Sequence, residues 1–226
     1  MIVQQFFKSL SYLFHPLLMP ILGVYMLFSN ATTPVSYLKL DALFFFPVEV
    51  KTYAYILLTV LTLVAPLISM FILYKNRMIS SFQLEDRQER FYPLALILFY
   101  YGLAYFYVRV QFPVDYQHPA LLGFLFGNLI TILLALILNF FTKISLHSIG
   151  VFGLAGMMLG YSQTQLPMLG LDGYTNLYLI IYILVVAGLI SSARLYLKAH
   201  SLGQVVSGMA IGFIVVYFTV KHGLFV

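Results

Sequence analysis

Long apolar stretches alternate with short polar segments along the whole chain. A helix needs about 20 apolar residues to cross the hydrocarbon core of a bilayer, and the stretches have roughly this length. They lack the short alternating segments that are typical of a membrane β-barrel. The pattern therefore predicts an all-α membrane protein, a bundle of six or seven transmembrane helices in a single membrane domain over residues 1–226. The predicted spans are about Leu10–Ser29, Tyr53–Tyr74, Pro93–Val110, Ala120–Phe141, Ile149–Met168, Leu177–Tyr196 and Val205–Val220.

Two of these spans carry residues that are unusual inside a helix. Pro16 and Pro20 should kink the first span without abolishing it, because neighbouring helices can satisfy the freed backbone groups. His15, which precedes the first proline, is interpreted as a polar residue at the membrane interface. Glycines at three- and four-residue spacing in the fifth span permit close contact with another helix. These are Gly150, Gly153, Gly156 and Gly160.

The composition agrees with a membrane protein and excludes several kinds of site. Only 8% of the residues are charged, whereas soluble domains carry about 25%. The pI of about 9.3 indicates lipid headgroups or an anionic substrate in a membrane protein, not nucleic acid. The absence of cysteine excludes disulfides, thiolate catalysis and cysteine-ligated metal or iron–sulfur sites.

Three polar segments, residues 75–93, 141–150 and 191–204, hold seven of the twelve Lys and Arg side chains. Each is separated from the next by two predicted spans, so all three should lie on the same side of the membrane. Ionisable groups within a membrane protein are costly and usually face the bundle interior or a water-filled cavity. The sequence therefore predicts one polar site on this side. Its cationic and imidazole side chains are Lys75, Arg77, Arg87, Arg90, Lys143, His147, Arg194, Lys198 and His200.

The spacing within these segments indicates a phosphate site. His200 and Gln204 are four residues apart at the start of a predicted helix, so the Gln204 amide oxygen can accept a hydrogen bond from one ring nitrogen. That contact would fix one tautomer and turn the other nitrogen outward as a nucleophile. Arg194 precedes them with forked donors for phosphoryl oxygens. The start of the Gly-rich helix offers amides to an anion, and the side chains alternating there are Lys143, Ser145 and His147.

These ordered motifs resemble the type 2 phosphatidic acid phosphatase superfamily of membrane lipid phosphatases. Its pattern has three parts: Lys-x6-Arg-Pro, Pro-Ser-Gly-His and Ser-Arg-x5-His-x3-Asp. The third part here reads Ala193-Arg194-x5-His200-x3-Gln204, with Ala for Ser and Gln for Asp. The second part reads Ile144-Ser145-Leu146-His147. The first part matches least, through the Arg87, Arg90 and Pro93 of DRQERFYP, and the resemblance covers about residues 75–220.

The resemblance implies that His200 attacks phosphorus to form a phosphohistidine, that Gln204 orients it and that His147 protonates the leaving alcohol. It implies hydrolysis of a lipid phosphate or pyrophosphate, such as phosphatidic acid, phosphatidylglycerol phosphate or an isoprenoid (pyro)phosphate. It implies a bacterial cytoplasmic membrane and no metal or other cofactor. The expected partners are the lipid substrate and membrane lipids. The implied phosphate ligands are Arg194, Ser145, Arg87 and Arg90. Lys143 is added as a candidate ligand because it precedes Ser145 and His147 at the start of the Gly-rich helix.

Gln204 leaves two alternatives open, because an amide orients a histidine but cannot stabilise its charged form. One is a non-hydrolytic protein that binds or moves anionic lipids, and the other is a lipid phosphotransferase. A metal site is disfavoured, since no acidic residue stands near His147 or His200 in the sequence. Asp86 is expected to pair with Arg90, four residues further on.

The orientation in the membrane is also left open. Eight Lys and Arg residues, counting Lys8, lie on the side of the motifs and four lie opposite. The positive-inside rule then places the motif side in the cytoplasm. Four of the eight are candidate phosphate ligands, and without them the two sides are equal.

Overall fold

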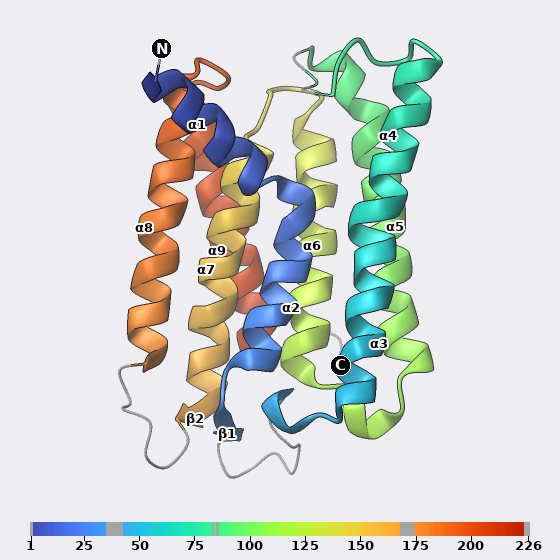
Figure 1. Cartoon of the computed structure of the whole chain (residues 1–226), viewed down its shortest axis with the longest axis vertical. Helices are drawn as coiled ribbons and strands as arrows, with labels where there is room; N and C mark the ends of the chain where they lie inside the picture. The colour runs from blue at the N-terminus through green and yellow to red at the C-terminus, as the bar shows by residue number, and fades with distance from the viewer. Residues whose placement is uncertain (1, 35–42, 83, 85, 168–174, 224–226) are drawn as a thin grey trace.

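Helices that run side by side form nearly all of the computed structural model, which describes residues 2–34, 43–82, 84, 86–167 and 175–223 (Figure 1). The α-helices are α1 (Ile2–Leu13), α2 (Met19–Ser29), α3 (Val48–Thr59), α4 (Ala65–Lys75), α5 (Phe91–Gln111), α6 (Pro119–Leu138), α7 (Leu146–Thr164), α8 (Thr175–Tyr196) and α9 (Leu202–His222). The π-helical segment η3 (Val60–Val64) joins α3 to α4. The 3-10 turns are η1 (Pro16–Leu18), η2 (Leu43–Phe45), η4 (Gln88–Arg90) and η5 (Val114–Tyr116).

Six helical runs in the described residues are long and apolar enough to cross a membrane. They are Ile2–Ser29, Val48–Lys75, Gln88–Gln111, Pro119–Leu138, Asn176–Tyr196 and Leu202–His222. α7 is a further long helix whose glycines and polar residues lower its hydropathy. It contacts α2, α6, α8 and α9, so much of its surface meets protein where another helix would meet lipid. The predicted all-α bundle of six or seven transmembrane helices is confirmed, and the protein is an integral membrane protein.

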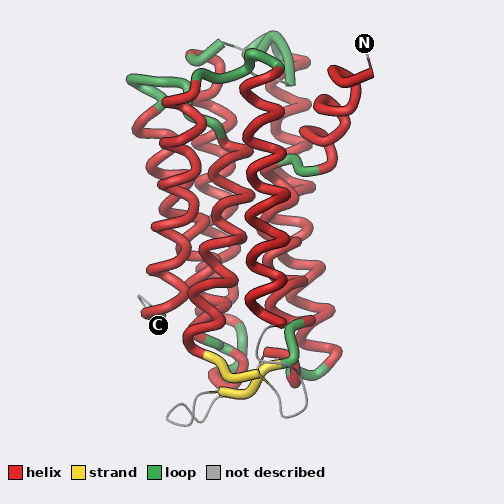
Figure 2. The backbone as a smooth tube through the Cα atoms, turned by 90° about the vertical axis from the view of Figure 1, so that its left-hand side faces the viewer, coloured by secondary structure: helices red, strands yellow, loops and turns green. Residues whose placement is uncertain are grey.

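The first predicted span breaks at its prolines and begins earlier than expected, at Ile2. α1 lies obliquely at one end of the bundle in both views (Figures 1 and 2). It packs against α8, where the rings of Phe7 and Tyr196 are 4.9 Å apart. The turn η1 then redirects the chain into α2, which continues to the opposite end of the bundle (Figure 1). The expected kink is therefore present as a change of direction between two helices.

The loops after α4, α6 and α8 all lie at the same end of the bundle as α1 (Figure 1). At the opposite end, β1 (Thr32–Pro34) pairs antiparallel with β2 (Gln165–Pro167), which ties the end of α2 to the end of α7 (Figure 2). The prediction that the three polar segments share one side of the membrane is confirmed by this arrangement.

α7 and α9 pack backbone against backbone through glycines. A Cβ atom added at Gly156 would collide with the Phe213 carbonyl oxygen, and one added at Gly212 would collide with that of Ile149. The contact predicted for the Gly-rich span is confirmed for Gly156. Because the two helices lie this close, their first turns meet at the end of the bundle where the polar segments gather.

Gly212→Ala is expected to destabilise the protein by about 1–3 kcal/mol, the usual cost of overpacking, since main-chain atoms on both helices would have to move. Gly188→Ala is the matched control, because a Cβ atom there meets nothing within 4 Å. Alanine favours a helix over glycine by about 0.5–1 kcal/mol. Thermal unfolding in detergent should therefore show a lower Tm for Gly212→Ala and an unchanged or higher Tm for Gly188→Ala. Equal Tm values would contradict the tight α7–α9 contact.

Candidate functional site

The three polar segments meet where α7 and α9 begin. The Ser145 backbone N–H donates to the Gln204 carbonyl oxygen at 3.3 Å, which joins the entry of α7 to the first turn of α9. The Arg90 guanidinium donates to the Ile144 carbonyl oxygen at 3.1 Å, which adds the segment before α5. Segments far apart in the sequence thus form one site.

His200 lies in the short connection between α8 and α9 and is only 7% exposed. Its Nδ1 atom is 3.0 Å from the Lys143 carbonyl oxygen and 3.3 Å from Gln204 Oε1. Both neighbours are acceptors, so Nδ1 carries the proton and Nε2 carries the lone pair. This tautomer is the one that a nucleophilic Nε2 requires.

Gln204 has two functions in this arrangement. Its side-chain Oε1 accepts a hydrogen bond from the Ser201 backbone N–H at 3.1 Å, and its backbone N–H donates to Ser201 Oγ at 3.4 Å. These two hydrogen bonds form a capping box at the start of α9. The same Oε1 contacts His200, as the sequence predicted, while Nε2 donates to Thr142 Oγ1 at 3.4 Å. The Lys143 carbonyl is the closer acceptor for His200. A main-chain group therefore shares the orienting role that the family motif gives to a carboxylate.

The surroundings of His200 favour its neutral form. Burial lowers the pKa of His200 to about 4, and the positive charges of Arg90 and Arg194 act in the same direction. The hydrogen bond to the Lys143 carbonyl acts in the opposite direction and is the smaller influence. Protonation at Nε2 would remove the lone pair, so the low pKa keeps this nitrogen available at neutral pH.

Arg194 lies in the last turn of α8, and its Nε atom is buried without a hydrogen-bond partner among the described residues. An unpaired buried donor costs about 1–3 kcal/mol, and more where the group is charged. The Arg194 charge interacts with His15, His147 and His200. A guanidinium with an unpaired N–H, whose charge acts on three imidazoles, is suited to bind the oxygen atoms of an anion.

The two arginines before α5 differ in their positions. Arg90 is 6% exposed, and its Nε donates to the Leu84 carbonyl oxygen at 2.9 Å. Arg87 is exposed, and its guanidinium donates to the Phe140 carbonyl oxygen at 3.1 Å. Both arginines thus link the segment before α5 to the segment between α6 and α7 through hydrogen bonds to carbonyl groups. The positive charge of Arg90 also acts on His200.

His147 occupies the first turn of α7 and reaches the N-terminal helix. Its Nε2 atom is 3.1 Å from the Ser11 carbonyl oxygen, so Nε2 carries a proton and donates a hydrogen bond to this acceptor. Its ring lies 5.9 Å from that of His15 at an interplanar angle of 79°. Its electrostatic neighbours are Arg194, His15 and His200, which places it within the same cluster.

A chain of hydroxyl groups lies behind this cluster. Ser191 Oγ donates to Ser148 Oγ at 3.2 Å, and Ser148 Oγ donates to Ser145 Oγ at 3.0 Å. Ser145 is 0% exposed and accepts this bond, which leaves its own hydroxyl hydrogen to turn toward a further acceptor. The candidate phosphate ligand Ser145 is thus fixed by α7 and α8 together.

The expected pairing of Asp86 with Arg90 is wrong, because the loop does not form the continuous helix that would bring them together. Asp86 Oδ1 accepts a hydrogen bond from the Gln88 backbone N–H at 2.9 Å, and the Arg90 guanidinium donates to the carbonyl groups of Leu84 and Ile144.

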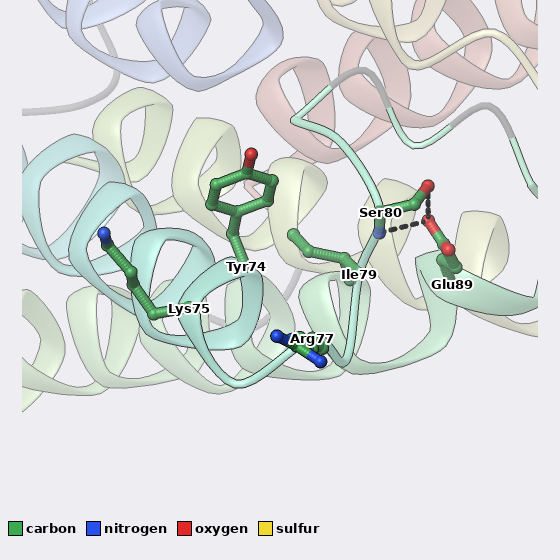
Figure 3. A pocket seen from close by; sticks show the side chains of 6 residues that line it. All are labelled: Tyr74, Lys75, Arg77, Ile79, Ser80 and Glu89. Carbon is green, nitrogen blue, oxygen red and sulfur yellow. Dashed lines mark hydrogen bonds between the residues drawn. The ribbon is translucent and has the colours of Figure 1, made fainter.

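Glu89 has a different set of partners: its carboxylate accepts hydrogen bonds from the Ser80 backbone N–H and hydroxyl (Figure 3). It lines a cavity of about 430 Å³ whose other walls are Tyr74, Lys75, Arg77, Ile79 and Ser80.

Sequence reasoning missed several contributors to the site. His15 was interpreted as an interfacial residue but lies beside His147. The carbonyl groups of Ser11 and Lys143 hold the two motif histidines, and no sequence pattern marks a main-chain acceptor. The Ser148 and Ser191 hydroxyls were not singled out as partners of Ser145. Within the described part of the chain, no three His, Asp or Glu side chains gather as a metal site would require.

The fold and the site define a class of protein: an integral membrane protein in which two motif histidines and an arginine gather at one end of the helical bundle. Residues 138–223 match the family model described as PAP2 superfamily. This part of the chain, from the end of α6 through α9, is similar to that superfamily, whose members are generally phosphatases. It contains the second and third motifs, so the resemblance predicted from them is confirmed. No curated protein and no solved structure matches the chain.

Proposed function

We propose that the protein hydrolyses a lipid phosphate or pyrophosphate through a phosphohistidine at His200. The observation that carries the proposal is the pair formed by a neutral His200, with its lone pair on Nε2, and Arg194, with an unpaired buried N–H. The first supplies a nucleophile and the second a donor for phosphoryl oxygens. The site is at one end of the helical bundle, and at a membrane surface this position would let a lipid headgroup enter while its tail stays in the bilayer.

In the first step, His200 Nε2 forms a bond to phosphorus and the bond from phosphorus to the leaving oxygen breaks. His147 enters this step as an imidazolium, gives its Nδ1 proton to that oxygen and keeps its Nε2–H on the Ser11 carbonyl. The N–H at Nδ1 stays on the Lys143 carbonyl and Gln204 Oε1, which offset the positive charge that develops on the ring. In the second step, water gives a proton to His147 and attacks phosphorus, the N–P bond breaks and phosphate leaves.

The test is phosphate release by the purified protein from a panel of lipid phosphates and pyrophosphates in the presence of EDTA. The proposal expects release from at least one lipid, at a rate that the chelator does not change. Loss of activity in EDTA that returns with a divalent metal would contradict the metal-free mechanism.

A second candidate is a non-hydrolytic protein that binds or moves anionic lipids. The uncharged Gln204 favours it, because an amide offsets the charge of a phosphohistidine less than a carboxylate does. Binding of a lipid phosphate without phosphate release, by folded protein, would support this candidate. Product formation that depends on an alcohol acceptor in place of water would identify a phosphotransferase.

The dependence of kcat/KM on pH should report the low pKa of His200. Protonation of Nε2 abolishes the nucleophile, so activity is lost as the pH falls through this pKa. The acid limb is therefore expected near pH 4 and not near 6.5, the ordinary histidine value. Phosphate release measured from about pH 3 to pH 8 tests this. An acid limb at 6.5 or above would show that the nucleophile is not the buried, cation-flanked His200.

Gln204→Asp is expected to keep or raise kcat. The Lys143 carbonyl still holds the Nδ1 proton, and a carboxylate adds a charge that stabilises the imidazolium. Gln204→Ala should lower kcat by about tenfold or less, the contribution of one neutral hydrogen bond. Phosphate release by both variants is the measurement. A well-folded Gln204→Asp protein without turnover would indicate a pocket built for another purpose.

A further inference from the structure

His15 lies in the turn between α1 and η1 and has a fixed tautomer. Its Nδ1 atom accepts from the Leu17 backbone N–H at 3.4 Å and so caps η1. A ring nitrogen that accepts a hydrogen bond carries no proton, so the hydrogen of neutral His15 is on Nε2. This is the opposite of His200, where Nδ1 carries the proton. His15 therefore presents a donor and is unsuited to be a nucleophile.

The opposite end of the bundle contains a matching histidine, which shows what capping alone requires. His118 also precedes a proline, and its Nδ1 accepts from the Ala120 backbone N–H at 3.1 Å at the start of α6. Its ring neighbours are Phe46 and Tyr161, with centroids 6.3 and 6.4 Å away. A histidine before a proline can therefore cap a helix with aromatic rings beside it, so capping does not require polar neighbours.

The surroundings of His15 are different. Its ring stands edge to face with that of His147, and the positive charge of Arg194 acts on it. The carbonyl of Ser11, one helical turn earlier, anchors His147. The N-terminal segment thus reaches the cluster at two points, although it lies outside the residues that match the superfamily.

We propose that His15 is a substrate-binding residue, whose Nε2–H donates to a phosphoryl oxygen that Arg194 also holds. The inference rests on the proposed function and adds a ligand from the N-terminal segment to that site. A neutral donor suits this position, because Arg194 and Arg90 already supply positive charge. Donors from two separate elements also fix the orientation of the headgroup.

The test compares His15→Asn with His118→Asn. Asparagine caps helices well, so its Oδ1 can replace Nδ1 as the acceptor in both variants while the Nε2–H is lost. The probe is a non-hydrolysable lipid phosphonate, whose Kd is measured in detergent, together with KM and kcat for the lipid phosphate that is turned over. His15→Asn should raise the phosphonate Kd and KM about tenfold, and His118→Asn should change them less than twofold.

A His15→Asn protein that binds the phosphonate like the wild type overturns the inference, even if its kcat falls, because a structural role would explain that result. If His15→Asn fails to fold, His15→Ser, another capping residue, is measured against His118→Ser. If the wild type binds the phosphonate but releases no phosphate from any lipid, the proposed hydrolysis fails, and a weaker Kd in His15→Asn still supports the inference. A wild type that does not bind the phosphonate overturns it.

Discussion

His200→Asn is expected to reduce phosphate release by about 10⁴-fold or more, as removal of a catalytic nucleophile commonly does. The Asn side-chain N–H can take the place of Nδ1 and donate to the Lys143 carbonyl, so the connection between α8 and α9 should keep its structure. What the variant lacks is the lone pair of Nε2. The loss should therefore appear in kcat, with little change in the Kd of a lipid phosphonate.

The measurement is phosphate release by the purified variant beside His118→Asn, which removes a buried imidazole at the opposite end of the bundle. His118→Asn should keep nearly full activity. If His200→Asn kept more than about one hundredth of the wild-type rate, His200 would not be the nucleophile.

Arg194→Met is expected to abolish most of the activity and at the same time to stabilise the protein. Removal of one donor to the developing charge in a transition state costs about 10²–10³ in kcat. The Arg194 Nε is buried without a partner in the described structure, so the native state bears an uncompensated desolvation cost. Methionine fills similar space without that cost, and the free energy of unfolding should rise by about 1 kcal/mol.

Lys198→Met is the matched control, because Lys198 is an exposed cation in the same connection between α8 and α9 that contains His200. It should change neither kcat nor Tm appreciably. Phosphate release and thermal unfolding in detergent test both parts of the prediction. A lower Tm for Arg194→Met would show that Arg194 supports the fold, and unchanged kcat would remove it from the site.

The sequence predicted the framework of the site because the spacing of apolar runs carries that information. Counting spans placed His147 and His200 on the same side, and the four-residue spacing of His200 and Gln204 predicted their contact, which the structure contains at 3.3 Å. The glycines of the fifth span predicted a close helix neighbour, and α9 is that neighbour for Gly156. These features follow from helical periodicity and membrane crossing alone.

The remaining features depend on loop conformation, which periodicity does not describe. Arg87 and Arg90 looked equivalent in the sequence, yet Arg90 is buried and Arg87 is exposed. Leu84, whose carbonyl binds Arg90, has a φ of 50°, a backbone conformation unusual for leucine. His15 is distant in sequence from both motifs, and only the oblique packing of α1 brings it to His147. Main-chain acceptors such as the Lys143 carbonyl carry no side-chain signature at all.

The central claim is the covalent intermediate, and the most direct measurement is to trap it. Wild-type protein is mixed briefly with a phosphate-labelled lipid substrate, quenched in alkali and digested, and the labelled residue is identified by mass spectrometry. The account predicts label on His200 in the wild type and none in His200→Asn. Steady phosphate release by wild-type protein with label absent from His200, or located on another residue, would contradict it.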